Sequence, residues 1–391
     1  MEKKEKVGVQ KCHSDESSRC KILIVTGGFF PSKKFGGPPV SVDNFCSLLH
    51  DEADCYIVTH NHDFGEKKQL AGITEGWNDR GTAKVLYLSD KEYGYAAFNS
   101  VVESIKPDYI YLQSLFSVYV LPCLRIAEKK GIKTVLAPRG ELCAGAFKKK
   151  YKKIPYILLL RIQRLLNDVT FQSTSVEETA AIKKYLGVST ENIHYLTNIP
   201  SIPSSLPERV EKKSGVGRFV FISRIHWKKN LLLAIKCLNG VKGEVTFDIY
   251  GPKEDEEYWN KCENSISELP DNIHVNYCGV LGQDEIHKTF NKYDAFLFPT
   301  LSENYGHVIA EALVTECIPI ISDQTPWTDM NESGAGWALP LTDEGAFIKA
   351  IQNVVDMNEE AIQLMRNTIE RYTSHKLNIN KLKAEYLDVF K

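Results

Sequence analysis

Short apolar runs that alternate with helical stretches constrain the fold of this chain more than any other feature of the sequence. The runs are rich in Val, Ile, Leu, Phe and Tyr, as is typical of parallel strands that are covered on both faces. Their alternation with helical patterns predicts βαβ units and an open parallel sheet. The first series of runs comprises KILIVTGG (21–28), CYIVTH (55–60), YIYLQS (109–114), TVLAPRG (134–140) and VTFQST (169–174).

The alternation stops at residues 197–217 and then starts again. This segment, TNIPSIPSSLPERVEKKSGVG, has three prolines, several serines and no apolar periodicity, which is the composition of a linker. The sequence therefore predicts an α/β chain of two Rossmann-like domains whose parallel sheets face each other across a cleft. The second series of runs comprises RFVFIS (218–223), VTFDIYG (245–251), HVNYCG (274–279), DAFLFP (294–299) and IPIISD (318–323).

A length of 391 residues exceeds what one hydrophobic core usually supports, which agrees with two domains. The first residues are polar and lack the apolar stretch of a secretory signal, so we interpret them as a flexible tail. The last residues form an amphipathic pattern that predicts a helix packing back on the first domain. The predicted divisions are the tail (1–20), an N-terminal domain (21–200), a linker (201–217), a C-terminal domain (218–372) and a C-terminal helix (373–391).

Composition and charge exclude several classes of protein. The formal net charge of −2 gives no overall bias toward nucleic acid, and we expect no nucleic-acid partner. No apolar stretch reaches the roughly 20 residues that cross a bilayer. The ten cysteines form no C-x-x-C pair, so a reduced, cytoplasmic protein fits better than a disulfide scaffold or a zinc site.

Charged and glycine-rich segments follow several of the predicted strands. Open parallel sheets bind ligands at the carboxyl ends of their strands, so two such sheets favour a site in the cleft between them. Arg224 and Lys229 follow the strand at 218–223 and suit a diphosphate, the first as a planar fork and the second as a point charge. Gly36 and Gly37 precede a helix, where backbone N–H groups can approach an anion. The alternative is a solvated surface lysine and a tight turn.

The segment SENYGHVIAEAL (302–313) follows the strand at 294–299 and holds two glutamates eight positions apart. If a helix begins near Asn304, Glu303 caps its positive end and Glu311 lies about 12 Å further along the axis, at about 1.5 Å per residue. That separation suits a sugar at one carboxylate and a ribose at the other, with a diphosphate on the first-turn N–H groups between them. The alternative is an N-cap acid and an unrelated surface glutamate.

Three segments together resemble the family 4 retaining glycosyltransferases, which have the GT-B fold. SENYGHVIAEAL resembles the E-x7-E motif of that family, SRIHWKKNL (223–231) its phosphate-binding Arg-Lys stretch, and GGPPVSVDNF (36–45) its N-terminal glycine loop. The similarity extends over residues 21–391, with the motifs in the family's order and at predicted strand ends. Each motif is weak alone, whereas the ordered set is specific.

The resemblance implies a nucleotide-sugar-binding C-terminal domain and an acceptor-binding N-terminal domain. In this scheme Glu303 contacts the donor sugar, while Arg224 and Lys229 neutralise the leaving diphosphate. The implied reaction moves a sugar from a UDP- or GDP-sugar to an acceptor hydroxyl with retention at the anomeric carbon. No metal or other cofactor is expected, and the chain contains no D-x-D segment. The other implied donor contacts are Gly37, Val280 at the nucleobase, Tyr305, Gly306, His307, Val308, and Glu311 at the ribose.

The chain departs from the family pattern beside the donor site. Asn230 stands where the family often has glycine, and Cys317 replaces another common glycine. Many members carry a histidine near the reacting sugar, whereas this chain has Arg139 and Glu141 in APRGEL (137–142). We interpret these two as sugar contacts. Arg139 binds an acceptor phosphate or the donor, and the alternative is that it pairs with a neighbouring acid.

A basic stretch at 147–167, FKKKYKKIPYILLLRIQRLLN, predicts contact with a membrane. It carries seven Lys and Arg residues and no acid, and cations beside an amphipathic helix attract anionic lipid. We expect a peripheral enzyme on the inner face of the plasma membrane, with a lipid-linked or oligosaccharide acceptor used in surface polysaccharide synthesis (O-antigen, capsule or exopolysaccharide). The alternative is a solvated basic turn before a core helix. The predicted membrane contacts are Lys148, Lys149, Lys150, Lys152 and Lys153.

Two other activities are compatible with parts of this pattern. Another GT-B enzyme, such as a nucleotide-sugar epimerase, would act on the donor without an acceptor. A dinucleotide-dependent oxidoreductase would show G-x-G-x-x-G after a strand, but Gly215-Val216-Gly217 and Gly334-Ala335-Gly336 both lack the third glycine.

Overall fold

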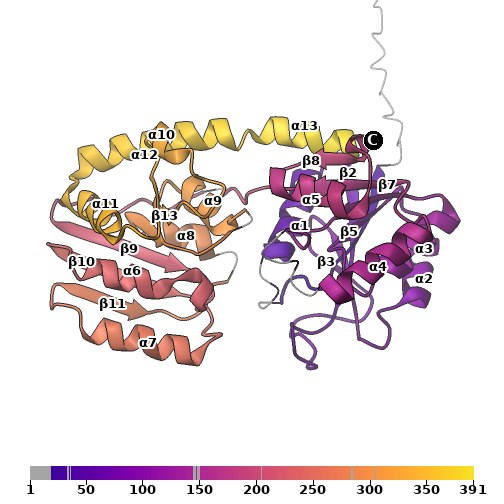
Figure 1. Cartoon of the computed structure of the whole chain (residues 1–391), viewed down its shortest axis with the longest axis horizontal. Helices are drawn as coiled ribbons and strands as arrows, with labels where there is room; N and C mark the ends of the chain where they lie inside the picture. The colour runs from indigo at the N-terminus through magenta and orange to yellow at the C-terminus, as the bar shows by residue number, and fades with distance from the viewer. Residues whose placement is uncertain are drawn as a thin grey trace, which may run out of the picture.

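The computed structural model describes residues 19–32, 35, 37–143, 147, 150–203, 205–282, 285–303 and 305–391. Each of the two domains is built on one sheet with helices packed against it (Figure 1). The predicted α/β architecture with two mainly parallel sheets is therefore confirmed. Most of the predicted tail, residues 1–18, lies outside the described residues.

The first sheet has eight strands in the order β3-β4-β2-β1-β5-β6-β7-β8. Every pairing is parallel except that of β3 with β4, which is antiparallel. Four of the five predicted runs end in the structure one to three residues early, because their last residues turn out of the sheet into the ligand-facing loops. The strands are β1 (Cys20–Val25), β2 (Ala53–His60), β3 (Trp77–Asp79), β4 (Lys84–Leu88), β5 (Tyr109–Gln113), β6 (Lys133–Ala137), β7 (Val169–Ser173) and β8 (Ile193–Tyr195).

Two clusters of buried apolar side chains hold the helices of the first domain against its sheet. One cluster joins α2, α3, α4 and α5 to the sheet, and the other joins α1 and the last helix of the chain to it. A central strand such as β5 is buried along its whole length, as its continuous apolar run predicts. The helices are α1 (Gly37–Leu48), α2 (Tyr95–Ile105), α3 (Val120–Lys130), α4 (Lys150–Ile162) and α5 (Val176–Leu186).

The second sheet has six parallel strands in the order β11-β10-β9-β12-β13-β14, and one apolar core spans its domain. The strands are β9 (Val216–Ile222), β10 (Glu244–Tyr250), β11 (Ile273–Tyr277), β12 (Ala295–Phe298), β13 (Ile318–Ser322) and β14 (Trp337–Leu339). The helices are α6 (Leu231–Leu238), α7 (Glu256–Ser267), α8 (Ile286–Phe290), α9 (His307–Val314), α10 (Met330–Ser333), α11 (Glu344–Asp356) and α12 (Glu359–Lys376).

The chain ends in α12 and α13 (Ile379–Val389), which run one after the other along both domains (Figure 1). The prediction of one helix over 373–391 is wrong, because α12 continues to Lys376 and Asn378 caps a separate helix through the N–H of Lys381. Helix α13 packs on the first domain, where Tyr386 donates to the Thr197 carbonyl at 3.0 Å and accepts from Gln172 at 2.8 Å.

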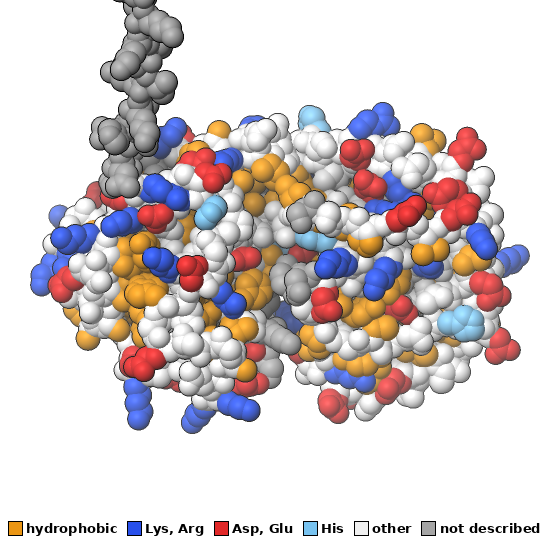
Figure 2. Space-filling view, turned by 180° about the vertical axis from the view of Figure 1, so that it is seen from behind, with side chains coloured by type: hydrophobic (Ala, Val, Ile, Leu, Met, Phe, Trp, Pro, Cys, Tyr) orange, Lys and Arg blue, Asp and Glu red, His pale blue; other side chains and the backbone are white. Residues whose placement is uncertain are grey.

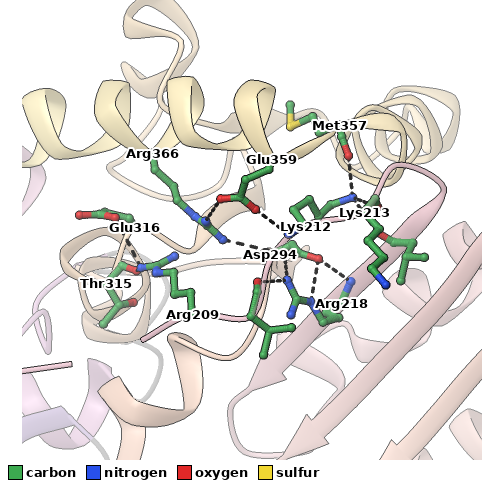
Figure 3. A network of polar contacts seen from close by, with 12 residues as sticks. Arg209, Lys212, Lys213, Arg218, Asp294, Thr315, Glu316, Met357, Glu359 and Arg366 are labelled. Carbon is green, nitrogen blue, oxygen red and sulfur yellow. Dashed lines mark hydrogen bonds and ion pairs between the residues drawn. The ribbon is translucent and has the colours of Figure 1, made fainter. Parts of the chain in front are cut away.

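The end of the linker is fixed to the second domain by a polar network (Figure 3). Lys212 is buried, and burial lowers its pKa. Its ammonium lies within hydrogen-bond distance of four backbone carbonyls, including that of Met357 at 2.9 Å. Beside it, Arg218 pairs with the fully buried Asp294 at 2.7 Å, and Arg366 of α12 lies within 4.0 Å of the same carboxylate. The network ties the chain entering the second domain to the helix that leaves it.

Candidate active site

A cavity of about 430 Å³ lies between the two domains. The first domain contributes Gly37 and Ser41 from the start of α1, together with Arg139 after β6 and Asn198 after β8. The second domain contributes residues that follow β9, β10, β11 and β12. From behind, the two lobes meet at an indentation on the lower edge (Figure 2). The cavity therefore collects the carboxyl ends of strands from both sheets, where such sheets bind ligands.

Helix α9 begins at His307, with Gly306 as its N-cap, so the prediction of a start near Asn304 is wrong. Asn304 itself lies outside the described residues. Gly306 has φ +78°, and a β-carbon there would lie 2.8 Å from Ile309, so both conformation and space require glycine. The left-handed turn moves the helix start away from Glu303, which lies in the preceding loop. The N–H groups of His307 and Val308 have no intrahelical acceptor, whereas that of Ile309 donates to the Gly306 carbonyl at 2.8 Å.

The two glutamates of the segment both line the cavity. Glu303 forms an ion pair with Lys229, and Thr300 donates to the same oxygen at 3.4 Å. Glu311 is only 4% exposed, which excludes the alternative of a surface glutamate. Burial and the nearby Glu311 carboxylate raise the pKa of Tyr305, whose hydroxyl is buried without a hydrogen-bond partner among the described residues.

The predicted diphosphate cations lie around a short 3-10 helix, η2 (Trp227–Lys229). Arg224 is about half exposed and forms two hydrogen bonds with the Glu254 carboxylate, at 2.9 and 3.2 Å. Asn230 ends η2 with φ +57°, the left-handed conformation that asparagine tolerates better than most residues. This explains how asparagine replaces the glycine that the family often has there.

The comparisons with known proteins agree with this geometry. Residues 205–371, which include both cations and both glutamates, match the family described as "Glycosyl transferases group 1". The chain carries a group 1 glycosyl transferase domain. Among curated proteins, none matches the sequence significantly.

Solved structures share the GT-B fold of this transferase over almost its whole length. Anabaena HepE, crystallised with UDP and glucose, is 14% identical over 95% of this chain and 99% of its own, with a TM-score of 0.69. S. aureus TarM, in complex with fondaparinux, alpha-GlcNAc-glycerol and UDP, is 12% identical over 95% and 100%, with a TM-score of 0.67. WaaG, a glycosyltransferase involved in lipopolysaccharide biosynthesis, is 11% identical over 95% and 99%, with a TM-score of 0.63. At these identities the likeness shows the fold alone.

Arg139 and Glu141 of the transferase differ in their surroundings. Arg139 lines the cavity, as predicted. Glu141 is not among the lining residues, and its carboxylate accepts hydrogen bonds from the Ser114 hydroxyl at 2.8 Å and the Leu115 N–H at 2.6 Å. The interpretation of Glu141 as a sugar contact is therefore corrected: its side chain holds the loop after β5.

The other predicted donor contacts, Gly37, Val280, Tyr305, Gly306, His307 and Val308, all line the cavity of the transferase. Asn198 and Ser41 line the cavity too, although neither was predicted as a site residue. Asn198 follows β8, and a residue just after a strand is a candidate site residue. With three residues, β8 is too short to be predicted as a strand, so this signal was missed. Ser41 lies in the predicted glycine-loop segment, but only the approach of α9 brings it to His307.

Helix α4 carries part of the predicted membrane contact of the transferase. Lys148 and Lys149 lie outside the described residues, as does the side chain of Lys150. Lys152 is exposed. Lys153 instead packs over the Phe116 ring at 4.5 Å and donates to the Glu141 carbonyl at 3.2 Å, so its assignment to a membrane surface is wrong.

The part of the transferase that the structure describes holds one group of side chains with the spacing of metal ligands, His60, His62 and Asp90. His60 is the last residue of β2, and His62 and Asp90 lie in the loops after β2 and β4. None of the three lines the cavity. No helix among the described residues has the length and apolar character needed to span a bilayer.

Proposed function

We propose that this protein is a retaining, metal-independent glycosyltransferase that moves a sugar from a UDP- or GDP-sugar to a hydroxyl of a glycan acceptor. One observation carries the proposal: Arg224, Lys229, Glu303 and Glu311 meet the start of α9 in a single cavity between the two sheets. The presence of UDP in the HepE and TarM structures favours UDP over GDP.

The donor diphosphate binds at the first turn of α9, where N–H groups and the helix dipole favour anions. Lys229 is held there by Glu303, so an arriving diphosphate exchanges one anionic partner of the lysine for another. Glu303 is then able to accept hydrogen bonds from the sugar hydroxyls. Glu311 accepts from the ribose, and Val280, half exposed at the cavity, borders the base.

Charge on the leaving diphosphate is met by Arg224 and Lys229 and not by a protonated histidine. Burial, reinforced by the charge of Arg139, lowers the pKa of His307 to about 3. A neutral imidazole at pH 7 supplies no proton to the leaving group, so fixed cations carry the stabilisation of the transition state. Retention at the anomeric carbon rests on the family resemblance.

An apolar strip on α4 supports a peripheral position on an anionic membrane at the cytoplasmic side. Its members are exposed although they are large and apolar: Tyr151 (73%), Ile154 (40%), Leu158 (48%) and Ile162 (79%). Exposed Lys152 and Arg161 accompany the strip, and Arg161 and Arg164 line a neighbouring cavity. Apolar side chains beside cations suit a bilayer with anionic headgroups. The acceptor is then lipid-linked and used in surface polysaccharide synthesis, the kind of process in which WaaG is involved.

Thermal-shift measurements with UDP, GDP and their sugars test the proposal first. A nucleotide at about 100 times its dissociation constant adds about 2.7 kcal/mol to the free energy of unfolding. Nuclear magnetic resonance of the product then gives its anomeric configuration, and turnover that survives EDTA supports metal independence. Binding of NAD with no binding of either nucleoside diphosphate would favour the oxidoreductase alternative, and a changed sugar without any acceptor product would favour an epimerase.

A further inference from the structure

Among the described residues, three cations line the cavity between the domains, and they differ in what neutralises them. Arg224 is paired with Glu254, and Lys229 with Glu303. Arg139 has no carboxylate within 4.0 Å among the described residues. Arg139 therefore differs from the other two cations, because no acidic group in the described part of the protein pairs with its guanidinium.

Neutral acceptors fix the Arg139 guanidinium in place. Its Nε donates to Gln113 Oε1 at 2.8 Å, its Nη1 to Asn198 Oδ1 at 2.6 Å, and its Nη2 to Gln113 Oε1 at 2.5 Å and to the Tyr111 hydroxyl at 3.2 Å. A guanidinium has five N–H donors, so these four contacts leave one Nη1 donor for a further acceptor. The backbone of Arg139 has φ +55°, which turns the residue out of β6 at the cavity.

An unpaired charge that is partly withdrawn from water is unfavourable, and neutral acceptors do not cancel it. The field of Arg139 acts within the cavity, because it is a cause of the lowered pKa of His307 at the start of α9. The positive end of the α9 dipole adds to that field. A rigid cation of this kind, with a donor remaining and a cavity in front of it, is suited to an anionic ligand group.

We propose that Arg139 recognises an anionic group, a carboxylate or a phosphate, on the substrate that lies between α9 and the first domain. The inference rests on the proposed glycosyl transfer and adds a substrate class to it. The group belongs either to the donor sugar, as in a uronic acid, or to the acceptor, as in a phosphorylated glycan. The alternative is a purely structural role, in which Arg139 only connects β5 and β6 to the segment after β8 through its hydrogen bonds.

Two matched pairs of substrates separate the sources of the anion. The donor pair is UDP-glucuronate and UDP-glucose, and the acceptor pair is octyl glucoside 6-phosphate and octyl glucoside. We expect kcat/KM of the wild-type protein to be at least about 30-fold higher for the charged member of one pair, as for other desolvated charge pairs. The pair that shows the preference identifies the substrate that carries the anion.

Two variants test whether Arg139 is responsible for the preference. Arg139→Gln removes the charge, and Asn198→Asp places a carboxylate where Nη1 now donates at 2.6 Å, neutralising Arg139 with almost no change of shape. Each variant should reduce the preference to within about threefold. Any change in the affinity for UDP should affect both members of a pair equally, because the two members are compared with the same nucleotide. A structural role predicts that Asn198→Asp leaves the preference intact. Because Asn198→Asp keeps the anchor, it decides the question even where Arg139→Gln does not fold.

The exposed Arg125, which donates to Gln163, gives a matched control, and Arg125→Gln should keep the full preference. Equal rates of the wild-type protein for both members of both pairs would overturn the proposal, as would a preference that survives Asn198→Asp. Failure of both UDP and GDP to bind the wild-type protein would instead contradict the proposed function itself, so the two failures are distinguishable.

Discussion

Ser41 Oγ on α1 lies 2.8 Å from Nε2 of His307 at the start of α9, so one hydrogen bond joins the two domains across the cavity. The His307 ring is buried, and its pKa is lowered from 6.5 to about 3, first by burial and then by the charge of Arg139. The contact therefore places a neutral imidazole at the boundary between the domains.

We expect acid to weaken the folded state through His307. A histidine whose pKa is lowered by folding binds a proton more readily in the unfolded chain. The contribution of His307 to the free energy of unfolding is therefore complete above about pH 6.5. It falls by about 1.4 kcal/mol per unit of pH from there toward pH 3. His307→Gln keeps a polar atom near Ser41 but does not titrate. The thermal midpoint of the wild-type protein should drop more than that of His307→Gln between pH 7.5 and pH 5.

The exposed His274 gives the control for this titration. His274→Gln removes an exposed ring outside the domain boundary and should leave the difference between the wild-type protein and His307→Gln in place. Parallel curves for the wild-type protein and His307→Gln would remove the histidine from the explanation.

Glu303→Gln should lower kcat by roughly two to three orders of magnitude, the range found when one group that stabilises a transition state is removed. The amide keeps the shape of the side chain but loses the charge that positions Lys229. Steady-state turnover measures the loss, and circular dichroism checks the fold. Glu257→Gln, at an exposed glutamate on α7, should leave turnover unchanged. Near-normal turnover of Glu303→Gln would exclude Glu303 from the reaction.

Arg224→Ala should likewise lower turnover by orders of magnitude, because the leaving diphosphate loses a planar, two-pronged cation. Its side chain is about half exposed, so the thermal midpoint should hardly change. Arg224→Lys restores the charge without the fork and should recover only part of the rate. Full recovery with lysine would show that the fork geometry is not needed.

Glu311→Gln should chiefly weaken nucleotide binding. A hydrogen bond to a charged group contributes about 1.5–3 kcal/mol, which corresponds to a roughly 10- to 150-fold higher dissociation constant for UDP. Calorimetric titration of the wild-type protein and the variant measures the difference. An unaltered affinity for UDP would contradict the ribose assignment, whatever the effect on turnover.

Ile162→Ser combined with Leu158→Ser should release the protein from vesicles that contain phosphatidylglycerol. Both side chains lie on the exposed strip of α4, and burying apolar surface in the bilayer stabilises binding by about 25 cal/mol per Å². Sedimentation with vesicles measures the bound fraction, which should also fall with salt. Leu364→Ser, at an exposed leucine on α12, is the matched control. If the double variant sediments with vesicles as the wild-type protein does, the strip on α4 does not bind the membrane.

The sequence by itself was sufficient for ten strands of the two sheets, without β3, β4, β8 and β14, and for the residues on which the proposed reaction depends. A strand that is buried on both faces needs a continuous apolar run, and the residue that follows it must turn into a loop at the ligand-binding edge. Local pattern therefore located Arg224, Lys229 and Glu303 after the ends of strands and Glu311 in the helix that follows. The family motif added that they act together, and their shared cavity agrees with this.

Only the tertiary structure decided which partner each charged side chain meets. Glu141 turned to the loop after β5, Lys153 to the rings of Phe116 and Phe147, and Arg139 to three neutral acceptors. Asn198 joined the cavity from 59 positions further along the chain than Arg139. Periodicity reports whether a position is buried, but the partner of a long side chain depends on how distant segments pack, and no local pattern contains that information.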